Sequence, residues 1–164
     1  MDPTPTPGNG HAKNFTTGTL LIDTNVLVYC YDRREPAKQA RAVGLIDKLI
    51  ESERVLLSTQ VLSEFFSIAL RKLHMTPAAA RLRIVEFVDT WNVLDVTAQI
   101  VVNAARGVVK HQLSYWDALL WATALTNRIP YILSEDFQDG IRIEGVRVLN
   151  PFQAAFDVDR LLRT

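Results

Sequence analysis

Four acidic residues of the sequence stand in or directly beside apolar segments, where an ionised carboxylate is costly unless something compensates its charge. Two of them, Asp23 and Asp136, come at the ends of apolar runs that read as buried strands. The other two, Glu64 and Asp117, have apolar neighbours three and four residues away, so they share the apolar stripe of a helix. All four positions are therefore candidates for chemistry.

Each acid also has a purely structural interpretation. Asp23 could cap a following helix, since Asp is among the best capping residues. Asp117 is the last residue of "SYWD", which resembles a capping box, and Asp136 opens "DFQDG", a typical acidic turn. Glu64 could lie at the edge of the apolar stripe of its helix, with its carboxylate exposed to water. For Asp23 and Asp136 taken singly, the structural interpretation is the stronger one, and only the four acids together change the balance.

The hydrophobic pattern predicts a scaffold that brings these acids together. Apolar strands are expected at "TLLID", "RVLLS", "WNVLDV", "YILSED" and "VRVLN". Helices are expected over residues 37–52, 59–73, 97–110 and 115–127, and another opens at "TPAAAR" with Thr76 as its cap. This alternation predicts a three-layer α/β/α fold around a central, mostly parallel sheet. Ligands bind outside the carboxyl ends of such strands.

Carboxylates gathered at one edge of that sheet would repel one another. Two unit charges about 4 Å apart cost roughly 1 kcal/mol in bulk water and roughly 4 kcal/mol at an effective dielectric of about 20. The acids would therefore hold protons or destabilise the domain unless a cation neutralised them. All-oxygen ligation suits Mg²⁺ or Mn²⁺. The sequence thus predicts a metal site with an open coordination position, and its ligands are Asp23, Glu64, Asp117 and Asp136.

Composition excludes several other classes of protein. The chain has 164 residues, 48% of them hydrophobic and 22% charged, which is typical of one soluble globular domain. Its 18 Lys plus Arg balance 18 Asp plus Glu, so it lacks the basic character of a non-specific DNA coat. Cys30 is the only cysteine, which excludes an internal disulfide and a thiolate zinc site and fits a cytoplasmic location.

The N-terminal residues differ from the rest in composition. Residues 1–18 are polar and rich in Pro, Gly and Thr, so we expect a flexible tail there and a single domain over residues 19–164. No apolar run approaches the roughly 20 residues that a membrane-spanning helix needs, and no membrane association is expected.

Four motifs of the sequence resemble those of PIN-domain ribonucleases, most closely the toxin components of VapBC-type toxin–antitoxin systems. They are "LLIDTNVLVY", "LSTQVLSEF", "SYWDALLWATA" and "ILSEDFQDG", in the order and rough spacing of that family between Thr19 and about Phe152. Each motif alone is weak, but four in order are specific. The resemblance implies a PIN-like α/β/α fold and endoribonuclease activity that depends on Mg²⁺ or Mn²⁺.

The resemblance also implies supporting residues and leaves two choices for the fourth acid. Asp136 fits the family's hydroxyl-x-Asp pattern through Ser134, where Thr is commoner, and Asp139 is close enough to replace or assist it. Asn25 matches the family's polar residue after the first acid and, with Ser134, would hold carboxylates or waters in place. The implied catalytic and metal-binding acids are Asp23, Glu64, Asp117 and Asp136.

The implied reaction is hydrolysis of an RNA phosphodiester without a covalent intermediate, with water activated on one or two metal ions. The implied partners are a single-stranded or structured RNA such as tRNA, a cognate antitoxin whose C-terminal segment covers the acidic crevice, and a second copy of the chain. Exposed apolar residues would be needed for the protein partners. Leu82, Val85 and Val88 are candidates, although such residues are more often core.

RNA binding needs cations and flat surfaces around the acids. Unpaired bases could stack on Tyr29, Tyr31 or Trp116, although Tyr29 and Trp116 fit core positions equally well. Two basic groups flank the first two motifs, and any single member can equally belong to a solvated helix face. They are Arg33, Arg34, Lys38 and Arg41, and Arg71, Lys72, Arg81 and Arg83.

Three other interpretations compete with the nuclease. A phosphatase of the haloacid-dehalogenase type needs a second Asp two residues after the first, and this position is Asn25. A dinucleotide-binding domain needs a Gly-rich loop after the first strand, and none follows it. The third is a PIN-like RNA-binding or scaffold module without catalysis. The presence of all four acids argues against the third interpretation but does not exclude it.

Overall fold

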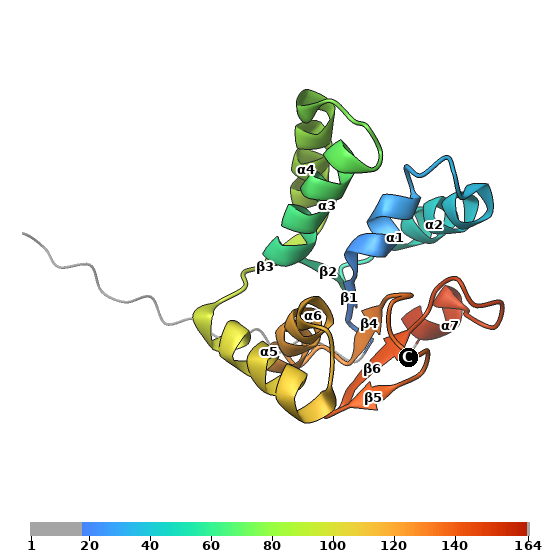
Figure 1. Cartoon of the computed structure of the whole chain (residues 1–164). Helices are drawn as coiled ribbons and strands as arrows, with labels where there is room; N and C mark the ends of the chain where they lie inside the picture. The colour runs from blue at the N-terminus through green and yellow to red at the C-terminus, as the bar shows by residue number, and fades with distance from the viewer. Residues whose placement is uncertain (1–17, 164) are drawn as a thin grey trace, which may run out of the picture.

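A six-stranded sheet forms the centre of the computed structural model, which describes residues 18–163 (Figure 1). Its strands are β1 (Leu20–Ile22), β2 (Val55–Ser58), β3 (Asn92–Leu94), β4 (Tyr131–Leu133), β5 (Arg142–Ile143) and β6 (Val146–Leu149). Their order across the sheet is β3-β2-β1-β4-β6-β5. All neighbouring strands are parallel except β5 and β6, which are antiparallel.

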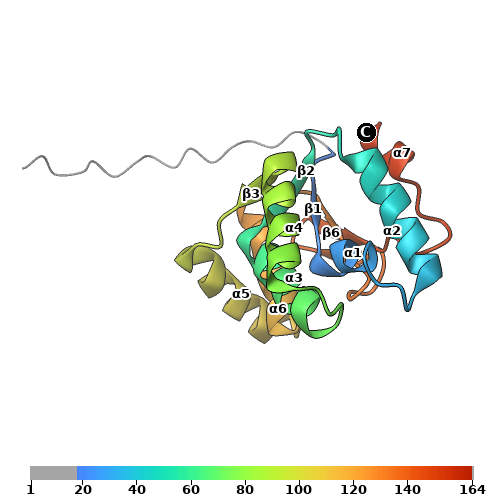
Figure 2. The same ribbon diagram turned by 90° about the horizontal axis from the view of Figure 1, so that it is seen from above.

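Helices cover both faces of this sheet. They are α1 (Thr24–Tyr29), α2 (Pro36–Leu49), α3 (Thr59–Arg71), α4 (Pro77–Thr90), α5 (Ala98–His111), α6 (Tyr115–Thr126) and α7 (Val158–Leu162). Figure 1 shows α1 to α4 on one side of the sheet and α5 and α6 on the other. Seen from above in Figure 2, α7 lies beside α2, to which it is joined by an ion pair of 2.6 Å between Lys48 and Asp159. The predicted three-layer α/β/α fold with a mostly parallel sheet is confirmed.

The core lies where the apolar strands meet the helices. Leu20, Leu21 and Ile22 of β1 have no exposed surface, because strands on both sides and helices on both faces enclose them. On the far face, Trp121 of α6 is fully buried and its indole N–H donates to the carbonyl of Ile143, 3.1 Å away. A continuous apolar run thus indicates a strand that is buried on both faces and can reach solvent only at its ends.

Three short elements were not predicted: α1, β5 and α7. α1 has six residues, of which Val26, Leu27 and Val28 are all buried, so it shows no amphipathic stripe. β5 has two residues and α7 has five, too few for a periodic pattern. The predicted strand "YILSED" ends earlier than expected, at Leu133, so Asp136 lies in the turn that follows β4. The predicted tail, residues 1–18, lies outside the described residues except for Gly18.

The close packing of α5 on α6, the two helices that cover one face of the sheet, can be tested by substitution at their contact. A Cβ added at Gly107 of α5 would lie 2.7 Å and 2.9 Å from ring atoms of Trp121, which is buried and hydrogen-bonded and has nowhere to move. We expect G107A to lower the free energy of unfolding by about 1–2 kcal/mol, because overpacking outweighs the better helix propensity of Ala. Denaturant unfolding measures the change.

The matched control is G44A in α2, where an added Cβ meets nothing within 4 Å. This variant should gain about 0.5–1 kcal/mol from helix propensity alone. Equal stabilisation by both substitutions would show that the contact between α5 and α6 is looser than described.

Candidate active site

The four predicted acids line one cleft of about 770 Å³ at the carboxyl ends of the central strands. Asp23 lies between β1 and α1, and Asp136 lies in the turn after β4. Glu64 and Asp117 reach the cleft from α3 and from the first turn of α6. Asp139 is not part of the lining, and its carboxylate accepts the backbone N–H of Asn150 at 2.7 Å. The structure therefore brings Asp136, and not Asp139, to the other three acids.

Asp23 is fixed by three hydrogen bonds at the N-terminus of α1. One carboxylate oxygen accepts the backbone N–H of Thr24 at 2.6 Å, so Asp23 is the N-cap of this helix. The other oxygen accepts the hydroxyl of Ser134 at 2.5 Å and the amide of Asn25 at 3.0 Å. The capping interpretation of Asp23 is thus correct. It is compatible with a place in the cleft, because Asp23 both caps α1 and lines the cleft.

Burial makes Asp23 the most perturbed acid of the site. Its side chain is only 7% exposed, and desolvation raises the pKa of its carboxyl from 3.8 to about 7. The hydrogen bonds from Ser134 and Thr24 oppose this rise, while the negative charges of Asp136 and Glu64 add to it. Hydrogen bonding alone therefore does not compensate the charge of Asp23.

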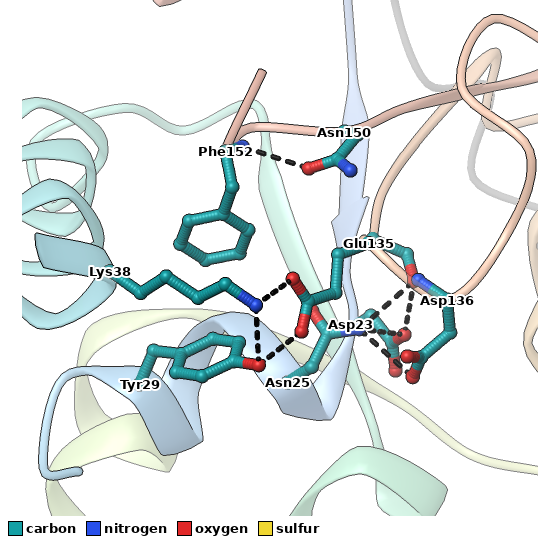
Figure 3. A network of polar contacts seen from close by, with 9 residues as sticks. Asp23, Asn25, Tyr29, Lys38, Glu135, Asp136, Asn150 and Phe152 are labelled. Carbon is teal, nitrogen blue, oxygen red and sulfur yellow. Dashed lines mark hydrogen bonds and ion pairs between the residues drawn. The ribbon is translucent and has the colours of Figure 1, made fainter. Parts of the chain in front are cut away.

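Asn25 and Ser134 connect the first acid to the fourth. The Asn25 amide donates to Ser134 Oγ and to an Asp136 carboxylate oxygen, at 3.1 Å each, besides its bond to Asp23. Ser134 Oγ also accepts the backbone N–H of Asp136 at 3.1 Å. Figure 3 shows Asp23 and Asp136 close to each other, beside Asn25. The two polar residues hold these carboxylates in place, and the supporting role in catalysis that the family resemblance implies for them stays a prediction.

Glu64 is oriented by two residues that sequence reasoning missed. Thr24 Oγ1 donates to one of its oxygens at 3.2 Å, and Gln60 Nε2 donates to the other at 2.8 Å. The same Gln60 amide donates to the backbone carbonyl of Trp116 at 3.1 Å. The spacing of Gln60 and Glu64, one helical turn apart, was the available signal. No local pattern links Thr24 to a residue forty positions away.

Asp117 depends on Ser114, the residue that caps α6. Ser114 Oγ accepts the backbone N–H of Asp117 at 3.3 Å and donates to its carboxylate at 2.7 Å. Burial raises the pKa of Asp117, the bond from Ser114 lowers it and the charge of Asp136 raises it again. Here the capping residue and the cleft-facing carboxylate are two different residues, joined by a hydrogen bond.

Glu135 points away from the cleft although it precedes Asp136. Lys38 Nζ lies 2.6 Å from its carboxylate and 3.0 Å from the hydroxyl of Tyr29, which also donates to Glu135 (Figure 3). The ring of Tyr29 packs edge-on against Phe152, with 5.0 Å between centroids. Glu135 and Tyr29 raise the pKa of Lys38. Lys38 and Tyr29 are therefore engaged with Glu135 and with the fold.

Most of the predicted basic residues are likewise engaged. Arg34 pairs with Asp32 at 2.7 Å, and Arg41 donates to backbone carbonyls of residues 151 and 153. Arg71 lines the main cleft. A second cleft shares Asp23, Glu64 and Asp136 with the first and adds Arg34 and Lys72. The acids thus lie where two clefts with basic residues in their walls meet.

The oxygen ligands present fit a hydrated hard cation. Carboxylates are the ligands that Mg²⁺ and Mn²⁺ prefer, and the uncompensated charge around Asp23 calls for a cation. Within residues 18–163, no three His, Cys, Asp or Glu side chains converge on a point where an ion could be held. Two buried amide oxygens beside the acids, Asn25 Oδ1 and Gln60 Oε1, have no donor among the described residues. This arrangement suits an ion that keeps several waters and uses few direct carboxylate ligands.

A sequence model of the PIN domain family matches residues 20–138, which is more than half of the chain and includes all four acids. The chain belongs to the PIN domain family. No curated protein matches the chain. No helix of residues 18–163 is long and apolar enough to cross a membrane.

Solved structures share the fold of this PIN domain at low identity. VapC20 of Mycobacterium tuberculosis, a toxin that cleaves the sarcin–ricin loop, is 22% identical over 72% of this chain and 92% of its own, with a TM-score of 0.59. A toxin–antitoxin complex from Klebsiella pneumoniae is 20% identical over 81% and 98%, with a TM-score of 0.60. DNA-bound VapBC from Salmonella typhimurium is 16% identical over 79% and 96%, with a TM-score of 0.57.

The raised pKa of Asp23 predicts a pH-dependent cost in the metal-free protein. Below about pH 4 the carboxyl is protonated in both states, whereas between about pH 4 and pH 7 only the unfolded state releases the proton. Wild type should therefore lose stability relative to D23N as the pH rises to about 7, by on the order of 4 kcal/mol. Unfolding by urea in EDTA across this range measures the difference, and D139N should follow wild type. Parallel curves for wild type and D23N would contradict the burial of an uncompensated carboxylate.

Proposed function

We propose that this PIN domain is an endoribonuclease that hydrolyses RNA phosphodiester bonds with the help of Mg²⁺ or Mn²⁺. The observation that supports it most is the meeting of Asp23, Glu64, Asp117 and Asp136 in one cleft. The four acids come from segments far apart in sequence, and two of them have raised pKa values because their charge lacks compensation. Structural ion pairs do not account for this arrangement, since no Lys or Arg pairs with any of the four among residues 18–163.

The residues of the chain have distinct parts in this proposal. Asp23, Glu64, Asp117 and Asp136 would hold the cation, directly or through its waters, and the bound cation would lower the pKa of a water and neutralise charge on the phosphate. Ser134 and Asn25 fix the carboxylates of Asp23 and Asp136, and Gln60 and Thr24 fix that of Glu64. Each acid thus meets the substrate in a set orientation, which limits the rearrangement that the reaction needs.

We further propose that the protein is a VapC-type toxin, cytoplasmic like its RNA substrate, that pairs with a second copy of itself and is neutralised by a cognate antitoxin. The structural relatives support this, because they include a toxin and toxin–antitoxin complexes that match this fold over nearly their whole length. Leu82, Val85 and Val88 support the need for a protein partner. They are 52%, 39% and 49% exposed on α4, so they are not core residues in the chain alone.

Loss of the first acid gives the test of the activity. The wild-type protein should cleave a mixed RNA pool only when Mg²⁺ or Mn²⁺ is added. D23N should cleave more than about a hundredfold more slowly, since even residues that only orient metal ligands cost about ten- to a hundredfold. Gel or sequencing analysis of the RNA ends measures the rates.

The matched control is D139N, which removes an acid of the same type that lies outside the cleft. It should cleave within about threefold of wild type. Equal cleavage by wild type and D23N would refute the site. No cleavage by wild type at any level of either metal would instead support the PIN-like module without catalysis.

A further inference from the structure

Trp116 differs from the other tryptophans of the chain in being open to solvent. It is 58% exposed, whereas Trp91 and Trp121 are 6% and 0% exposed. It lies in the first turn of α6 and forms part of the wall of the acidic cleft, next to Asp117 in sequence. A large aromatic surface is thus left in water at the edge of the site, where it contributes little to the core.

The backbone of Trp116 is linked to the acidic site by a hydrogen bond. The carbonyl of Trp116 accepts a hydrogen bond from Gln60, whose amide group also orients Glu64. Tyr115 packs edge-on against the indole, with 5.3 Å between ring centroids. Trp116 is therefore fixed relative to Glu64 and Asp117 by contacts that do not involve the free face of its ring.

The surroundings of Trp116 favour a nucleotide over an apolar peptide. Ser63, Ser67 and Arg71 of α3 belong to the same cleft, so the wall adds hydroxyls, a guanidinium and one flat ring to the aliphatic side chains of Ile68, Val96 and Leu119. Phosphate and base together need a cation and an aromatic face of this kind. The other candidates for stacking are engaged, because Tyr29 bonds to Glu135 and Tyr31 packs on Phe65 at 5.8 Å.

We propose that Trp116 is a specificity-determining residue on which an unpaired nucleobase of the substrate stacks, so that the cleft takes single-stranded RNA. This inference rests on the proposed function. In a duplex each base face is covered by its neighbours, so only an unpaired base can offer a face to the indole. Stacking tolerates all four bases, and Trp116 therefore selects for unpaired structure and not for sequence.

Direct binding tests the inference with variants that carry D23N, so that the strand stays intact while Mg²⁺ is present. The probes are unstructured RNA decamers of adenosine or uridine, the same chain without bases, and an RNA duplex. Saturation with a single strand should quench the share of the tryptophan emission of the D23N protein that Trp116 contributes, since Trp116 is the one exposed tryptophan of the three. The chain without bases and the duplex should leave the emission unchanged.

Binding affinity, measured by fluorescence anisotropy of labelled strands, distinguishes the contribution of the Trp116 ring from that of other residues. W116L should weaken binding of the single strands about tenfold to a hundredfold, to the level of the chain without bases, whereas W116F should stay within about threefold. L82A is the control for the loss of an exposed apolar side chain, because Leu82 is 52% exposed on α4 and is not part of the cleft wall. It should bind as tightly as the D23N protein.

Three results would overturn the inference: no binding of any single strand, equal binding by W116L, or equal binding of the duplex. If W116L kept its affinity for RNA but no longer formed a complex with a coexpressed antitoxin, Trp116 would belong to a protein interface. Failure of the proposed function gives a different pattern, since wild type would then cleave nothing while the D23N protein still bound single strands through Trp116.

Discussion

The structure depends on the burial of one carboxylate at the end of its most buried strand. β1 has no exposed surface and delivers Asp23 to the edge of the sheet, where little water reaches it. Such a group is stable only if hydrogen bonds and a nearby positive charge replace its hydration. The hydrogen bonds come from α1 and from the turn after β4, which explains why both lie against the end of this strand. Among the described residues no Lys or Arg pairs with Asp23, so its raised pKa is what the chain alone provides.

The order of the strands places the other acids around Asp23. β1 lies between β2 and β4, so the segments that leave these two strands, α3 and the turn with Asp136, flank it. The fourth acid, Asp117, comes from the opposite face through the N-terminus of α6. Asp23 thus lies between three segments, α3, α6 and the turn after β4, and each of them contributes one further acid. This makes the site a property of the parallel topology and not of any single motif.

The sequence allowed the sheet, its layers and the acids to be predicted, because each leaves a local trace. Continuous apolar runs mark buried strands, and an acid within such a run stands out. Some partners of the acids leave no such trace, and Ser134 was expected only from the family resemblance. Thr24 bonds to Glu64 and Ser134 to Asp23 only because the fold brings distant segments together. Trp116 shows the same limit, since its exposure depends on what packs around α6 and not on its neighbours in the sequence.

The turn after β4 places two consecutive acids in opposite directions. Asp136 faces Asn25 and the cleft, while Glu135 is neutralised by Lys38 of α2 outside it. If Lys38 became apolar, Glu135 would keep its charge without a counter-ion one residue from the site. A fifth carboxylate without a counter-ion would then stand beside the four acids. The charge balance around the acids therefore extends to Lys38, a residue of α2 that does not line the main cleft.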